Sequence, residues 1–134
     1  MTQAPRRFWI LAFPDLPNPV GGIKQMHRVG EAIQACGHEV VLVQDDARFH
    51  PRWFHSDLPT TDRQSWLTRT DLTFERDVVI LAETFLPELP AFKPGVPKIL
   101  FNQNGAYSFG IVGKRFVKTA KVLALYRHPD LQQI

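Results

Sequence analysis

The sequence predicts an α/β fold, in which a Rossmann-like parallel sheet of four or more strands carries helices on both faces. Apolar segments of strand length recur along the chain, at residues 8–13, 39–44, 77–82 and 97–102. Segments with helical spacing or helix-boundary residues separate them. Strands joined through such crossovers pair in parallel, so both faces of the sheet are expected to be covered.

The first strand and helix are the most clearly marked elements. Residues 8–13 form an apolar run, and three prolines in the following loop prevent its continuation. Gly21 and Gly22 then precede a helix expected over residues 23–36. Its apolar residues recur every three or four positions, and Gly37 ends it.

The remaining elements alternate in the same way. Valine-rich residues 39–44 and the apolar run 77–82 predict two further strands. A short helix is expected around residues 61–67. Any helix within residues 83–92 must be short because prolines interrupt it, and residues 97–102 form the fourth strand.

The chain closes on a helix and the beginning of a strand. Residues 111–126 have helical spacing, and a fifth strand is expected to begin near residues 130–134. The length of 134 residues fits one domain. We therefore expect residues 1–134 to form a single Rossmann-like domain.

Composition narrows the classes of function. The net charge of +3, from 16 basic and 13 acidic residues, does not predict nucleic-acid binding. The single cysteine excludes an internal disulfide, and no signal peptide or membrane-spanning run is visible, so a cytoplasmic location is expected. No metal-ligand spacing and no G-x-G-x-x-G fingerprint occurs, so neither a metal nor a cofactor is predicted.

The predicted ligand site lies beyond the carboxyl ends of the strands, where open parallel sheets bind their ligands. Backbone N–H groups at the start of the first helix can receive a phosphate, a carboxylate or a sugar hydroxyl. Polar side chains after the third and fourth strands converge on the same edge. The residues that we expect to bind a ligand there are Gly21, Gly22, Lys24, Glu83, Gln103 and Asn104.

Each of these residues also has a plainer explanation. The glycine pair suits a tight loop, Glu83 suits the start of a helix because of the helix dipole, and the amides suit a turn. No nucleophile–base pair accompanies them, so no catalytic residue is assigned. The pattern favours a polyhydroxylated or phosphorylated ligand.

Three histidines and three lysines are further candidates for a functional role. His27 is expected on the helix surface, and His50 and His55 are expected to pack beside neighbouring aromatic residues. A stripe formed by Lys114, Lys118 and Lys121 is expected to be a solvated helix face. Weak contact of this stripe with anionic lipid is the alternative, at about 1 kcal/mol for each lysine at best.

The ordered motifs resemble the N-terminal domain of GT-B fold glycosyltransferases of the retaining, nucleotide-sugar type. The resemblance rests on PNPVGGIKQMHR at residues 17–28 and on CGHEVVLV at residues 36–43. The strands over residues 77–82 and 97–104 extend it to nearly the whole chain. It implies a Rossmann-like half of an enzyme whose active site lies between two domains.

The resemblance also implies which substrate each of the two domains binds. The N-terminal half holds a sugar or lipid acceptor, and an absent C-terminal half holds the nucleotide-sugar donor. Gly21 and Gly22 would meet the donor phosphates or the transferred sugar. Relatives often carry a histidine after the fourth strand, where this chain has Gln103 and Asn104. A hexosyltransferase domain that is inactive alone is therefore expected.

Two other functions stay open from the sequence. The chain could be a non-catalytic α/β module that binds a phosphorylated or sugar ligand at the same loop. It could also be a subunit of a split enzyme, paired with a separate catalytic chain.

Overall fold

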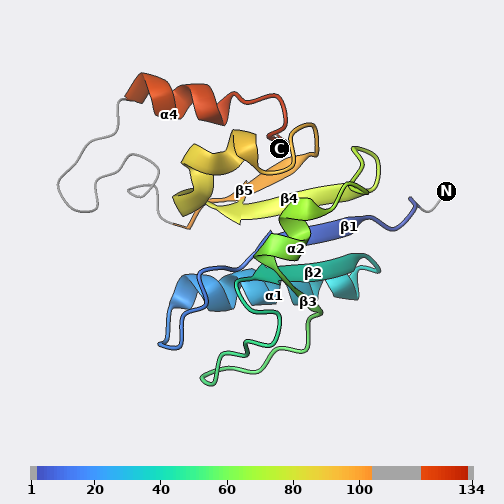
Figure 1. The fold of residues 1–134 in the computed structure, drawn as a ribbon, viewed down its shortest axis with the longest axis vertical. Coiled ribbons are helices and arrows are strands. Elements are labelled where there is room, and N and C mark those ends of the chain that lie inside the picture. The colour runs from blue at the N-terminus through green and yellow to red at the C-terminus, as the bar shows by residue number, and fades with distance from the viewer. Residues whose placement is uncertain (1–2, 104–118, 133–134) are drawn as a thin grey trace.

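A computed structural model describes residues 3–103 and 119–132 and confirms the α/β fold (Figure 1). All strands of its five-stranded sheet are parallel, in the order β3-β2-β1-β4-β5. The strands are β1 (Arg7–Leu11), β2 (Glu39–Gln44), β3 (Thr60–Asp62), β4 (Asp77–Ala82) and β5 (Lys98–Phe101).

Helices cover both faces of the sheet. Figure 1 shows α1 behind the sheet and α2 in front of it, and η1, a 3-10 helix, and α4 pack on the same side as α2. The bounds are α1 (Gly21–Ala35), α2 (Arg63–Thr68), η1 (Glu83–Ala91) and α4 (Thr119–Tyr126). No helix in the described part of the chain is long and apolar enough to cross a membrane.

The two layers of core follow from the alternation of side chains along the strands. Trp9 and Leu11 face α2 and η1, and Ile10 between them faces α1. Strand β4 repeats this pattern, with Leu81 on the first side and Ile80 on the second. Because both faces are buried, the strands read as continuous apolar runs rather than as alternating ones.

Strand β3 was not predicted from the sequence. It has only three residues, Thr60–Asp62, all partly exposed, and it pairs with the end of β2 at the edge of the sheet. Such a short polar segment carries no apolar pattern. Asp62 also caps α2, because its carboxylate accepts a hydrogen bond from the Ser65 amide at 2.8 Å.

Three other boundaries differ from expectation. Helix α1 begins at Gly21, so both glycines belong to its first turn instead of preceding it. Strand β1 ends at Leu11, two residues earlier than expected. Residue Leu131 makes only an isolated parallel bridge to Lys98, so the described residues contain no full strand after α4.

A buried carboxylate joins the amino ends of β1 and β4. Asp77 accepts hydrogen bonds from Arg7 Nε at 2.6 Å, from Trp9 Nε1 at 2.8 Å and from the Thr73 amide at 2.8 Å. Burial on its own raises the pKa of Asp77, but these hydrogen bonds outweigh it and hold the pKa below its ordinary value. Asp77 therefore contributes stability above about pH 4, which is lost as pH falls through the folded-state pKa.

We expect Asp77→Asn to lower the free energy of unfolding by about 2–3 kcal/mol at neutral pH, because Arg7 loses its charged partner. Urea denaturation measures this loss, which should shrink as pH falls below about 4. Asp46→Asn is the control, because this exposed carboxylate pairs with Arg48 at the surface. Equal denaturation midpoints for Asp77→Asn and the wild type would contradict the assignment.

Helix α1 approaches the sheet closely at Gly30. A Cβ atom there would lie 2.7 Å from Leu58 Cδ1, 3.0 Å from Ile10 Cδ1 and 3.2 Å from Val40 Cγ1. These neighbours are buried in the core on the α1 side, so they have little room to give way.

We expect Gly30→Ala to destabilise the protein by about 1–3 kcal/mol through overpacking, despite the better helix propensity of alanine. Gly21→Ala is the matched control in the same helix, because nothing lies within 4 Å of the position of its Cβ. Thermal unfolding of both variants makes the comparison. A Gly30→Ala protein as stable as Gly21→Ala would show that the helix can move away from the sheet.

Candidate functional site

The strand order reverses at β1. The chain passes from β1 to β2 and β3 on one side, and then returns to β4 and β5 on the other side. In open parallel sheets, ligands bind in the crevice beyond the carboxyl ends of the strands at such a reversal. The segments that leave β1 and β4 after Leu11 and Ala82 therefore flank the expected site.

A cavity of about 320 Å³ lies at this place. This volume is at the lower end of the roughly 300–1,000 Å³ that is usual for small-molecule sites. The segment after β1, the first turns of α1 and the residues after β4 all contribute to its wall. The lining residues are Leu11, Phe13, Pro14, Leu16, Val20, Gly22, Ile23, Met26, Ala82, Glu83, Thr84, Phe85 and Gln103.

Three of the predicted site residues meet in this cavity. Glu83 is only 3% exposed, and its carboxylate accepts a hydrogen bond from the Gln103 amide at 3.1 Å. The Gln103 side chain donates to the Gly22 carbonyl at 3.1 Å. Hydrogen bonds therefore join the start of α1 to the residues that follow β4 and β5, which are far apart in the sequence.

Gly22 lets the Gln103 side chain approach the start of α1. An added Cβ would clash with Gln103 Oε1, so a larger side chain displaces Gln103 from the cavity wall. The neighbouring position 21 is different, because it is exposed and no described residue lies within 4 Å of the place of its Cβ. Of the two glycines, Gly22 lines the cavity and Gly21 lies outside its lining.

The start of α1 leaves backbone donors available at the cavity. Its N-cap residue, Val20, makes no side-chain cap, and the first turn contains no acidic residue. The Val20 carbonyl accepts from the Ile23 amide at 3.0 Å, and the amides of Gly21 and Gly22 have no acceptor among residues 3–103 and 119–132. The helix dipole adds partial positive charge at the same point.

The loop between β1 and α1 is fixed to the end of β2. The Asp15 carboxylate accepts hydrogen bonds from the Asp45 amide at 2.9 Å and from the Asp46 amide at 2.8 Å. Phe13 in turn packs against Phe85, with ring centroids 4.8 Å apart, and lies under the Arg63 guanidinium. The wall of the cavity is therefore held in place without a ligand.

The remaining predicted site residues do not join this group. Lys24 is half-buried on α1 but does not line the cavity. Asn104 lies outside the described residues, as do Lys114 and Lys118 of the lysine stripe, and nothing is described of the Lys121 side chain. In the described part of the chain, no cluster of side chains is able to hold a metal ion.

Two features of this region were missed from the sequence. The cavity wall is mostly apolar, whereas the polar residues at the strand ends predicted a polar ligand. His27 was expected at the surface but is only 1% exposed. The helical spacing contained a signal for this burial, because His27 lies four residues after Ile23 and three before Gly30, on the side that faces the core.

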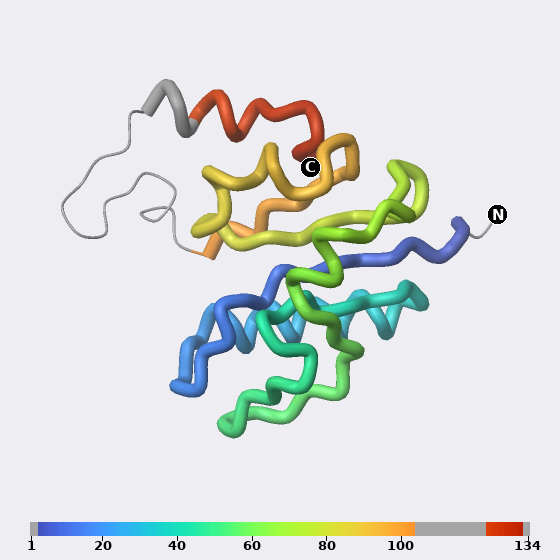
Figure 2. The backbone as a smooth tube through the Cα atoms, in the orientation of Figure 1, coloured from blue at the N-terminus to red at the C-terminus, as the bar shows by residue number. Residues whose placement is uncertain are grey.

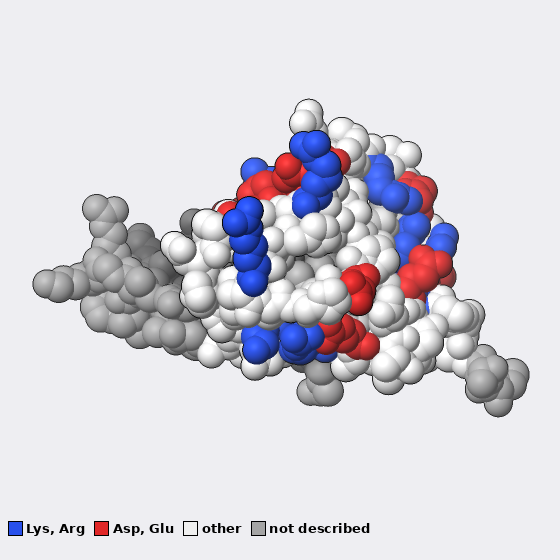
Figure 3. Space-filling view, turned by 90° about the horizontal axis from the view of Figure 1, so that it is seen from below, with Lys and Arg blue, Asp and Glu red and all other residues white. Residues whose placement is uncertain are grey.

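Charged side chains are interspersed over the face that Figure 3 presents. Basic and acidic groups alternate there, and no continuous basic area stands out on this face. The chain as a whole has 16 basic and 13 acidic residues, which is a mild excess. This face offers no extended surface for a phosphate backbone.

The chain has no match among protein-family models, curated proteins or solved structures. What the site can bind is therefore argued from its own residues. They combine an apolar enclosure, one buried carboxylate, one side-chain amide and the free backbone donors of a helix start.

Proposed function

We propose that this chain is the acceptor-binding half of a glycosyltransferase that uses a nucleotide-sugar donor. The sequence resemblance to GT-B enzymes suggests the class. The observation that carries the proposal is the cavity at the strand-order reversal, where the buried Glu83 carboxylate and Gln103 meet Gly22. The donor would be held by a second domain on the open side of this edge.

The lining of the cavity indicates the kind of acceptor. Phe13, Ile23 and Phe85 provide an apolar surface that suits an aromatic or aliphatic body better than a bare sugar. Glu83 and Gln103 are the polar groups that could bind a hydroxyl, because a carboxylate can accept several hydrogen bonds. We infer an acceptor alcohol whose apolar body fills the cavity and whose hydroxyl points toward Glu83.

The glycine pair at the start of α1 suits contact with the sugar donor. Gly21 is exposed, and its amide is free of acceptors within the described residues. An anionic phosphate or a sugar hydroxyl is the group that a helix start with free donors binds best. We propose that the phosphates or the transferred sugar of a donor held by a second domain meet this helix start, and that the second domain contributes residues to the formation of the new glycosidic bond.

The first expected outcome is that the purified chain does not transfer sugar by itself. With UDP-glucose as donor and umbelliferone as acceptor, neither glycoside formation nor donor hydrolysis should rise above the rate without protein. Chromatographic analysis of both products measures this. Robust turnover by the isolated chain would contradict a site that needs two halves.

The second expected outcome is that the isolated chain still binds the acceptor and that Gly22→Val blocks this binding. Valine at position 22 would displace Gln103 and enter the cavity wall. Titration calorimetry with umbelliferone should show a loss of affinity of at least about tenfold, equal to roughly 1.4 kcal/mol.

Gly21→Val is the matched control, because it carries the same propensity change in the same helical turn but meets open space. It should bind umbelliferone like the wild type. Equal binding by both valine variants would refute the acceptor site. Turnover by the isolated chain would instead favour a stand-alone enzyme.

A further inference from the structure

A second cavity, of about 230 Å³, lies between α1, β2 and the connection from β2 to β3. Figure 2 shows that residues 45–59 leave the sheet after β2 and return at β3 as a long excursion. Connections of this length without regular structure are commonly functional. In the part of the chain that the structure describes, the two cavities share no lining residue, so we treat them as separate sites.

The wall of the second cavity contains buried polar atoms without partners. They are both ring nitrogens of His27, the Oε1 atom of Gln44 and the Oγ atom of Ser56. His27 and Gln44 are each only 1% exposed. Buried polar groups in native proteins are nearly always hydrogen-bonded, so these four atoms are the groups with which a molecule bound here would pair.

The size of the cavity indicates more than a bridging water. One ordered water needs only about 10–15 Å³ of such a volume, far less than the space available here. The space is also too small for an extended ligand, because drug-sized sites begin at roughly 300 Å³. A single compact ring matches it.

The polar groups favour an uncharged ligand. Burial lowers the pKa of His27, so its imidazole is neutral and offers one N–H donor and one nitrogen acceptor. Gln44 adds an acceptor, and the Ser56 hydroxyl can act as either. Among the described residues, no lysine or arginine lines the cavity, and Asp57 is the carboxylate of its lining, 2.9 Å from His55 Nε2.

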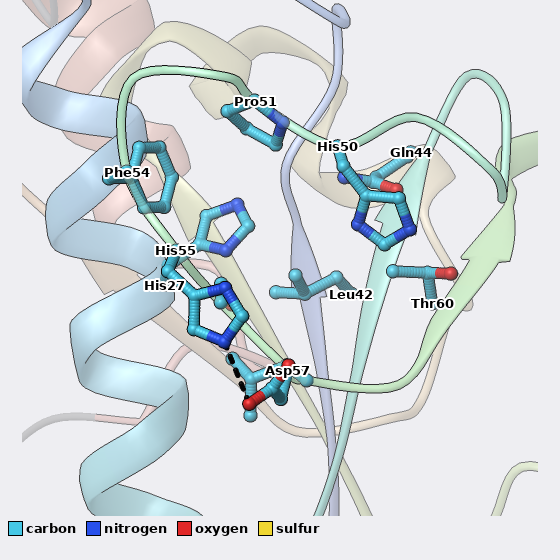
Figure 4. Close-up of a pocket in the computed structure, with 11 residues that line it drawn as sticks. His27, Leu42, Gln44, His50, Pro51, Phe54, His55, Asp57 and Thr60 are labelled. Atoms are coloured by element: carbon cyan, nitrogen blue, oxygen red, sulfur yellow. Dashed lines mark hydrogen bonds and ion pairs between the residues drawn. The ribbon is translucent and has the colours of Figure 1, made fainter.

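The apolar parts of the wall suit the carbon faces of a ring. Figure 4 shows His27, Phe54 and His55 on one side of the cavity and Gln44, His50 and Thr60 on the other, with Leu42 between them. The Phe54 ring stands edge-on to the His27 ring, with centroids 4.7 Å apart. A ring placed between these two sides would meet polar atoms at its rim and apolar groups at its faces.

The wall is also held in position by contacts with the rest of the fold. The Thr60 hydroxyl donates to the Ala47 carbonyl across the excursion. Arg28 on α1 donates to the His55 carbonyl at 3.3 Å, and its guanidinium lies 5.8 Å from the centre of the Phe54 ring. The excursion is therefore tied to α1.

We propose that this second cavity binds a neutral monosaccharide, whose hydroxyl groups pair with His27, Gln44 and Ser56. Hydroxyl groups both donate and accept, which matches the mixed set of unpaired atoms. The proposal does not rest on the glycosyltransferase assignment, because it uses no residue of the first cavity.

The test is an NMR titration of the ¹⁵N-labelled chain with glucose, galactose, mannose and N-acetylglucosamine at millimolar concentrations. At least one sugar should cause saturable shifts of the His27 ring nitrogens and of the Gln44 side-chain amide. Glucuronate should bind more weakly than glucose, because its carboxylate would face Asp57 and find no cation on the wall. Adenosine is the comparison for a planar heterocycle.

Two variants make the assignment specific. His27→Phe and Gln44→Met keep similar volumes but remove the polar atoms, and each should weaken sugar binding at least tenfold. His38→Phe, the same change beyond the far end of α1, and Gly22→Val, in the other cavity, should leave it unchanged. Either of these two variants alone is enough to test the proposal, so the experiment remains decisive if the other variant does not fold.

Three titration results would overturn the proposal: none of the sugars causes saturable shifts, glucuronate binds at least as tightly as glucose, or only adenosine binds. Sugar shifts that persist in the folded His27→Phe or Gln44→Met variant would also overturn it. Gly22→Val also separates this proposal from the acceptor site, because it removes umbelliferone binding there and leaves the sugar shifts at His27.

Discussion

The buried carboxylate of Asp77 fixes the register of β1 against β4, and the position of the first cavity depends on this register. Asp77 lies opposite Arg7 in the strand register and binds side chains of both Arg7 and Trp9. A shift of one residue would turn every side chain of β1 to the other face of the sheet. With the amino ends fixed, the carboxyl ends of both strands reach the same edge, where Glu83 and Gly22 meet.

Helix α1 connects the two cavities. Its first turns supply Gly22, Ile23 and Met26 to the cavity at the strand-order reversal, and the next residue, His27, lies on the wall of the second cavity. Close packing at Gly30 holds this helix against the sheet, so it cannot easily shift toward either side. Under the two proposals, the same helix contributes to an acceptor site in one cavity and to a sugar site in the other.

The sequence predicted the architecture and part of the site for a clear physical reason. Buried parallel strands have to be apolar throughout, and the residues that follow them gather at one edge, so Glu83 and Gln103 could be placed near Gly22. The apolar lining could not be predicted, because loop residues such as Leu16 and Phe85 carry no periodic pattern. Strand β3 is too short and polar to be recognised, and the partners of His27 depend on the path of residues 45–59.

The central claim is that the cavity between the carboxyl ends of β1 and β4 receives an acceptor alcohol. A crystal structure of the chain with bound umbelliferone tests it most directly. The account predicts that the coumarin ring lies against Phe13, Ile23 and Phe85, with its hydroxyl within hydrogen-bond distance of Glu83. Umbelliferone bound elsewhere on the chain, or in this cavity with its hydroxyl turned away from Glu83 and Gln103, would contradict it.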